Sequence, residues 1–159
     1  MNIFVLDENP KKCAKFHKDK HVNKMLLESA QMLCTAHHYN GNDCGVEPPY
    51  QSTHENHPCT EWARESRENY TWLLRLAENL LAEYNHRWGN KIHATTQVVA
   101  WLKNYKPWFP NSGLTPRPLA MDYQYKVNYD NVVEAYRAYY IGEKTEGASW
   151  TNRPKPSWI

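Results

Sequence analysis

The segment from residue 20 to residue 39 constrains the fold most, because it predicts a long helix that is apolar around nearly its whole circumference. Placed at about 100° per residue, its apolar residues fill one broad arc and continue on the far side. The polar residues form a band roughly 80° wide, made of His21, Lys24, Glu28, Gln31 and Thr35. Such a helix is normally buried. The polar band is therefore either the only solvent-exposed face of the helix or the wall of an internal site.

The polar band places a base, an amine and a carboxylate on one face, a combination that supports proton transfer or amine chemistry. We take Glu28 as a candidate general base or electrostatic stabiliser, Lys24 or Lys20 as a candidate amine nucleophile, and His21 as a candidate proton shuttle. Gln31 would line the same site. The alternative for Lys24 and Glu28 is an ordinary i,i+4 salt bridge.

A second long helix, expected over residues 60–88, also carries polar residues on its apolar stripe. These are Ser66, Asn69 and Arg87. Buried polar groups need hydrogen-bond partners, so the three residues form either a structural network or the lining of a ligand site. We expect the polar band of the first long helix to face them.

The remaining sequence completes a mainly α pattern. Prolines and glycines predict long loops over residues 40–58 and 106–118, and 159 residues suit one domain. We expect a single-domain bundle of about four to five helices with an extended N-terminal segment and long loops. The other expected elements are a strand or extended segment over 2–6 and helices over 11–18, 91–105 and 130–144.

Two groups of histidine and cysteine residues could bind a metal ion, and these residue types favour zinc. Their members are Cys13, His17 and His21, spaced four apart, and His54, His57 and Cys59 in HENHPC. Neither spacing matches a standard zinc finger, so we expect no cofactor, with zinc as the alternative. His54 and His57 precede a helix in a loop, where functional residues concentrate, and are candidate substrate-binding residues. Alternatively, His57 caps or packs beneath that helix.

The distribution of charge along the chain favours a nucleic-acid partner more strongly than the net charge does. DNA is the expected nucleic acid. The net charge is only +2, and the pI of about 8.3 is below the value of about 9 that marks many nucleic-acid binders. However, six lysines lie between residues 11 and 24, and the carboxyl end is basic and aromatic. Arg137, Arg153 and Trp158 are therefore further candidate substrate-binding residues.

The sequence gives no indication of a membrane partner or of secretion. No stretch approaches the ~18 apolar residues of a membrane span, and the start MNIFVLDENPKK lacks the layout of a signal peptide. We expect a cytoplasmic protein whose four cysteines are reduced.

Several segments, spread over nearly the whole chain, resemble a family of small uncharacterised proteins of tailed bacteriophages. They are FVLDENPKKCAKFHKDKHVNKMLLESAQML, HENHPCTEWARESRENYTWL, EYNHRWGNKIH, LAMDYQYK, AYRAYY and the final W-x-x-R-P-x-P-x-W. The resemblance implies a phage-encoded protein that works in the cytoplasm of an infected host cell.

A weaker resemblance is to the phage pyrimidine-dimer DNA glycosylases. Those proteins are small and helical, with an extended amino end, a glutamate on an early helix and an aromatic, basic tail. NIFVL, Glu28 and RPKPSW match these features here. That family attacks with an amino-terminal threonine exposed by removal of methionine, whereas this chain begins Met1-Asn2, so its nucleophile is not carried over.

Together these patterns favour a phage-type enzyme that acts on nucleobases or nucleotides, with DNA as the expected substrate and a glycosylase or other base-processing reaction. Two alternatives remain open. One is a non-catalytic module that binds nucleic acid or a host protein. The other is a metal-dependent hydrolase or nuclease that uses His17, His21, His54 and His57.

Overall fold

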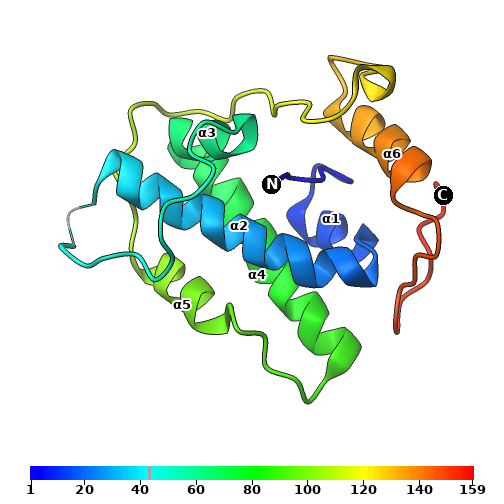
Figure 1. The fold of residues 1–159 in the computed structure, drawn as a ribbon, viewed down its shortest axis with the longest axis horizontal. Helices are drawn as coiled ribbons and strands as arrows, with labels where there is room; N and C mark the ends of the chain where they lie inside the picture. The colour runs from blue at the N-terminus through cyan, green and yellow to red at the C-terminus, as the bar shows by residue number, and fades with distance from the viewer. Residues whose placement is uncertain (43) are drawn as a thin grey trace.

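The computed structural model describes residues 1–42 and 44–159, and its fold is mainly helical (Figure 1). This confirms the expected mainly α class, although the described residues form six α-helices and not four to five. A short 3₁₀ turn, Tyr123–Tyr125, precedes the last helix. The helices are α1 (Pro10–Phe16), α2 (Asp19–Asn40), α3 (Pro58–Glu65), α4 (Arg67–Trp88), α5 (Thr96–Asn104) and α6 (Val132–Glu143).

The additional helix arises because the second long helix, expected over residues 60–88, is interrupted at Ser66. The backbone of Ser66 is extended, with φ −144° and ψ 160°, and its side chain accepts a hydrogen bond from the N–H of Asn69. Serine is a favoured N-cap residue because its hydroxyl satisfies a free N–H of the first helical turn. The cap ends α3 and starts α4 in a new direction.

Local signals set the ends of the other helices. Asn9 accepts hydrogen bonds from two N–H groups of α1, and Pro10 occupies its first position, where the missing N–H costs nothing. Gly41 ends α2 with φ +76°, a conformation that glycine adopts without steric cost. The α5 helix begins at Thr96, later than residue 91, because the backbone and ring of His93 bind the N–H groups of Thr96 and Thr95.

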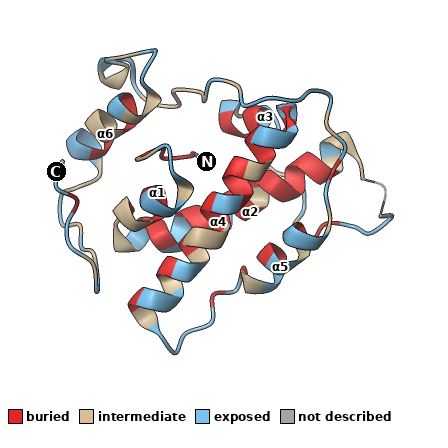
Figure 2. Ribbon diagram, turned by 180° about the vertical axis from the view of Figure 1, so that it is seen from behind, coloured by how far each residue is buried: buried red, intermediate tan, exposed pale blue. Residues whose placement is uncertain are grey.

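The core lies where α2 and α4 pack against each other, and the buried residues concentrate along these two helices (Figure 2). Val22, Leu26, Met32 and Leu33 of α2 are completely buried. Other helices complete the enclosure, because α3 and α5 each pack against both α2 and α4.

The N-terminal segment is an extended chain in the core, and the described residues contain isolated bridges but no β-strand. Ile3 to Leu6 are at most 5% exposed. The ring of Phe4 stacks on His21 at 4.6 Å between centroids, and Arg137 of α6 donates a hydrogen bond to the carbonyl of Leu6 at 2.9 Å. The segment thereby joins α6 to the rest of the fold, as Figure 1 shows.

No helix in the described part of the chain combines the length and the apolar character needed to cross a membrane.

Four histidines of the described residues are buried, and three of them, His17, His21 and His37, are at 0%, 6% and 1% exposure. Burial lowers the pKa of His17 to about 4, that of His21 to about 2 and that of His37 to about 4. All three rings are therefore neutral at pH 7.

These histidines predict a loss of stability in mild acid. Each folded-state pKa lies below the unfolded value of about 6.5, so the unfolded chain binds protons first as the pH falls from 6.5 towards 4. We expect the free energy of unfolding to fall by about 1.4 kcal/mol per pH unit for each histidine in that window, measured by urea denaturation.

The variant His17→Gln should reduce this slope by the contribution of one proton, because the amide does not titrate. His54→Gln, which changes an exposed histidine, should leave the slope unchanged. Equal slopes for wild type and His17→Gln would show that His17 is not held neutral by burial.

Candidate functional site

The carboxylate of Glu28 lies between two amines. Its Oε2 is 3.8 Å from the α-ammonium of Met1, and its Oε1 is 3.6 Å from the Nζ of Lys24. The main-chain N–H of Asn2 also donates to Oε2, at 3.1 Å. The side chain of Glu28 is only 11% exposed, whereas that of Lys24 is 57% exposed, so a nearly buried carboxylate has one amine that reaches solvent.

The amino end is fixed in place by hydrogen bonds to Asn2. The side-chain amide of Asn2 donates to the carbonyl of Ala120 at 2.9 Å, and its Oδ1 accepts from the hydroxyl of Tyr136 at 3.0 Å. The thiol of Cys59 lies 3.7 Å from the same oxygen. Because these partners come from α3, α6 and the loop before α6, the position of the α-amine depends on the tertiary fold.

His57 completes this group, which we call the Glu28 site: Met1, Asn2, Lys24, Glu28 and His57. As the N-cap of α3, His57 accepts the N–H of Cys59 on its Nδ1 at 3.1 Å, so the alternative that it caps the helix is confirmed. Burial lowers the pKa of His57 most, the positive amino terminus lowers it further, and Glu28 opposes them. His57 is therefore a neutral base within electrostatic range of both the amine and the carboxylate.

His54 lies beside this site without joining it. It is exposed, its Nδ1 is 2.7 Å from the hydroxyl of Thr53, and its charge contributes to lowering the pKa of His57. Gln31 is half-buried one turn beyond Glu28 on α2, and its side chain makes no hydrogen bond within the described residues.

The polar band does not face Ser66 and Asn69, and that expectation is corrected. Glu28 contacts the amino end, whereas the amide of Asn69 donates to the carbonyl of Trp62 at 2.9 Å and to the hydroxyl of Thr115 at 2.7 Å. Ser66 donates to the carbonyl of Gly113 at 2.6 Å. Asn69 and Ser66 therefore form a structural network that holds the loop at residues 113–115.

His21 is also placed away from the Glu28 site. Its ring packs between Phe4 and the edge of Tyr140, at 4.6 and 5.3 Å. Since burial lowers its pKa to about 2, the ring does not take up a proton at physiological pH. It therefore does not fit the role of a proton shuttle.

Two arginines proposed for substrate binding are instead engaged by the buried carboxylate of Glu83. Arg87 donates to Glu83 at 3.2 Å and to Asp19 at 2.9 Å. Arg153, from the carboxyl tail, contacts both oxygens of Glu83 at 2.7 to 3.2 Å. Glu83 thereby ties the tail to α4, and its pKa is lowered, because the two arginines outweigh the effect of burial.

Arg137 and Trp158 likewise make structural contacts. The guanidinium of Arg137 lies 4.9 Å from the ring centroid of Trp158, donates to Leu6 and is 3.6 Å from Asp7. Trp158 packs edge-on against Phe16 at 5.7 Å. The aromatic, basic tail thus covers α1 and the N-terminal segment.

A basic and aromatic groove runs along α2 from Leu27 towards the amino end of the helix. It consists of two adjoining cavities, of about 290 and 400 Å³, that share Asn23 and Tyr84. We call it the α2 groove. Its cations are Lys20, Lys24 and Lys91, and its aromatic residues are Tyr50, Tyr84 and Trp88. Lys24 belongs to both the groove and the Glu28 site, so the two adjoin at this side chain, although Glu28 itself lines neither cavity.

The described residues contain no cluster of three or more His, Cys, Asp or Glu side chains with the geometry to hold a metal ion. In the group of Cys13, His17 and His21, two side chains are engaged by main-chain carbonyl groups. Cys13 donates to the carbonyl of Phe4, and His17 bonds to the carbonyl of Cys13. Burial raises the pKa of Cys13 to about 12, which opposes formation of the thiolate that zinc binds.

Sequence reasoning named Lys20, Lys24, Glu28 and His57 as candidates, but it gave no indication of the α-amine and Asn2 beside Glu28. The apolar run NIFVL indicates only that the amino end is buried. No local pattern shows that a main-chain amine lies beside a residue 27 positions away, because that contact exists only in the folded chain.

Comparisons with protein-family models, curated proteins and solved structures found no match to this chain.

The buried Glu83 network gives a test of the structural role of Arg87 and Arg153. Glu83→Gln removes the shared anion and leaves two cations without it, so we expect a loss of about 3 kcal/mol in the free energy of unfolding, the usual scale for breaking a buried ion pair. Urea denaturation at pH 7 measures it.

Glu78→Gln is the matched control, because Glu78 pairs with Lys103 at 3.1 Å on the surface. It should cost less than about 1 kcal/mol. If both variants lost the same small amount, Arg87 and Arg153 would not depend on Glu83, and a role for them in binding would regain support.

Proposed function

We propose that this chain is a base-processing enzyme of the DNA glycosylase type, with its reaction centre at the Glu28 site. The observation that carries the proposal is a nearly buried carboxylate 3.6 and 3.8 Å from two amines. One of these amines, that of Lys24, also lines a groove with further lysines and aromatic rings. The extended amino end and the glutamate on an early helix agree with the resemblance to phage pyrimidine-dimer glycosylases.

The arrangement suits covalent removal of a base. An amine that has lost a proton to Glu28 attacks C1′ of the deoxyribose, and the C1′–N bond to the base breaks. The base leaves with that electron pair and takes up the proton. Opening of the sugar ring transfers a second proton from nitrogen to O4′ and leaves an imine, which water hydrolyses to the free amine and an abasic sugar.

Glu28 has two tasks in this scheme. It accepts the proton of the attacking amine, and its negative charge stabilises the positive charge that develops on the sugar as the base departs. Its low exposure strengthens the second effect, because a charge acts more strongly where water is excluded.

The α2 groove provides the surface for the strand. Lys20 and Lys91 would contact phosphates, and Tyr50, Tyr84 and Trp88 would stack on unpaired bases. An enzyme that acts on a base in a duplex must first turn that base out of the stack. A groove that combines cations with half-buried aromatic rings suits a base in that position.

The decisive experiment is reduction with borohydride during incubation with oligonucleotides that carry damaged or modified bases. We expect a covalent protein–DNA adduct with at least one such base. Glu28→Gln should retain the fold and lower the rate of adduct formation by about 10²-fold or more, the scale of general acid–base catalysis.

Glu146→Gln, at an exposed glutamate outside the site, is the control and should behave as wild type. Thermal melting of each variant separates loss of activity from loss of folding. An unchanged rate in folded Glu28→Gln would refute the catalytic role of Glu28.

Two further variants identify the attacking amine. Lys24→Met removes the side-chain amine, and one additional residue before Met1 displaces the α-amine from Glu28. As a class, α-amines lose their proton about two to three pH units below lysine side chains, so a larger fraction of them is neutral near pH 7. Exactly one change should abolish the adduct; if neither does, the covalent scheme is wrong.

DNA binding itself should depend on the α2 groove and on salt. Lys20→Glu and Lys91→Glu should weaken binding to all sequences alike, and each should reduce the slope of log K against log salt by about 0.7 to 0.9. Fluorescence anisotropy at several salt concentrations measures this slope.

Charge reversal at Lys11, Lys12 and Lys15 of the lysine-rich amino region should also weaken binding to all sequences alike. No effect of these changes would restrict the contact surface to the α2 groove. Absence of DNA affinity even at low salt would exclude this function. Binding without a covalent adduct on any substrate would favour the non-catalytic binding module.

A further inference from the structure

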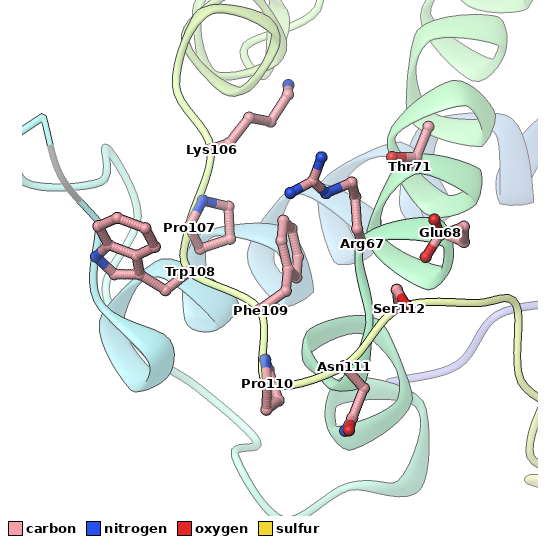
Figure 3. A pocket seen from close by; sticks show the side chains of 10 residues that line it. All are labelled: Arg67, Glu68, Thr71, Lys106, Pro107, Trp108, Phe109, Pro110, Asn111 and Ser112. Atoms are coloured by element: carbon pink, nitrogen blue, oxygen red, sulfur yellow. The ribbon is translucent and has the colours of Figure 1, made fainter.

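A second cavity, of about 1030 Å³, lies between α4 and the segment that follows α5 (Figure 3). We call it the Arg67 cavity. None of its lining residues belongs to the Glu28 site or lines the α2 groove. They are Arg67, Glu68, Thr71, Lys106, Pro107, Trp108, Phe109, Pro110, Asn111 and Ser112.

The segment that forms one wall is held in place at several points. The N–H of Trp108 donates to the carbonyl of Gly41 at 2.9 Å, and its carbonyl accepts from the amide of Asn40 at 2.8 Å. Pro107 and Pro110 each fix one backbone angle. The cavity is therefore formed before any ligand arrives, which lowers the conformational cost of binding.

The cavity has an excess of positive charge. Within the described residues, the side chain of Arg67 makes no hydrogen bond or ion pair, so its five N–H groups are available. Lys106 donates to the carbonyls of Leu102 and Lys103 at 2.6 and 3.2 Å, which leaves one of its three N–H groups free. The carboxylate of Glu68 accepts the N–H of Gly113 and is the single acidic side chain among the lining residues.

The rest of the lining is apolar or carries neutral polar groups. In Figure 3, the ring of Phe109 and the guanidinium of Arg67 project into the same space, whereas the side chain of Lys106 extends along the wall towards the end of α5, where its amine is bound. Pro107 and Pro110 extend the apolar side of the cavity, and hydroxyl groups come from Thr71 and Ser112. The cavity thus combines a cationic part, an apolar part and hydrogen-bonding groups.

We propose that the Arg67 cavity binds a mononucleotide, with the phosphate at Arg67 and Lys106 and the base against Phe109 and the prolines. Arg67 can hold two phosphate oxygens at once, because its donors form a planar fork. The volume is at the upper end of the range of about 300 to 1,000 Å³ typical of pockets for small organic ligands, far more than an inorganic phosphate needs. The proposal does not depend on chemistry at Glu28.

The test is titration calorimetry with a deoxynucleoside 5′-monophosphate, the corresponding nucleoside and inorganic phosphate as separate ligands. We expect the monophosphate to bind at least 10-fold more tightly than either fragment. Arg67→Gln should weaken it by 10-fold or more, and Lys106→Met should also weaken it. Lys103→Met, at an exposed lysine outside the cavity, and Glu28→Gln should leave it unchanged.

Several results would overturn the proposal. They are no binding of the monophosphate at about 1 mM, equal affinity in wild type and folded Arg67→Gln, and phosphate alone binding as tightly as the nucleotide. A single-stranded oligonucleotide whose binding requires Arg67, with no binding of the monophosphate, would instead make the cavity part of a strand-binding surface. Melting temperatures of the variants identify any that fail to fold.

Discussion

The burial of α2 is the constraint on which the rest of the structure depends. A helix can be surrounded by protein because its backbone hydrogen bonds are made within the helix, but its side chains must then be apolar or find partners. Along α2 the apolar residues pack against α3, α4, α5 and the N-terminal segment. A buried polar side chain on the helix, such as the carboxylate of Glu28, therefore needs specific partners, and the arrangement around Glu28 follows from this.

Glu28 shows how one set of contacts serves both stability and chemistry. A carboxylate with little exposure loses most of its hydration, which costs free energy unless charges and hydrogen bonds replace the water. Here the replacements are the α-amine, the N–H of Asn2 and Lys24. The same groups place two amines within 4 Å of a base, so a satisfied buried charge is also an arrangement suited to amine chemistry.

The charges of this protein divide into those that hold the fold and those that remain available. Arg87, Arg137 and Arg153 attract attention in the sequence, yet each is engaged by a carboxylate and packs within the protein. Lys20 and Arg67 have no ion pair within the described residues and line cavities. Net charge alone cannot make this distinction, because it counts paired and free cations alike.

The sequence by itself determined the helical class, the buried character of α2 and the polar band that contains Lys24 and Glu28, because helical periodicity is a local property that side-chain polarity reveals directly. It also identified His57 before a helix. Tertiary structure decided which groups meet that band. The α-amine reaches Glu28 because the N-terminal segment enters the core beside α2. Asn69 does not reach Glu28, because Ser66 caps a new helix and both residues bind a distant loop. These contacts join residues far apart in the chain, and their geometry depends on how the helices pack together.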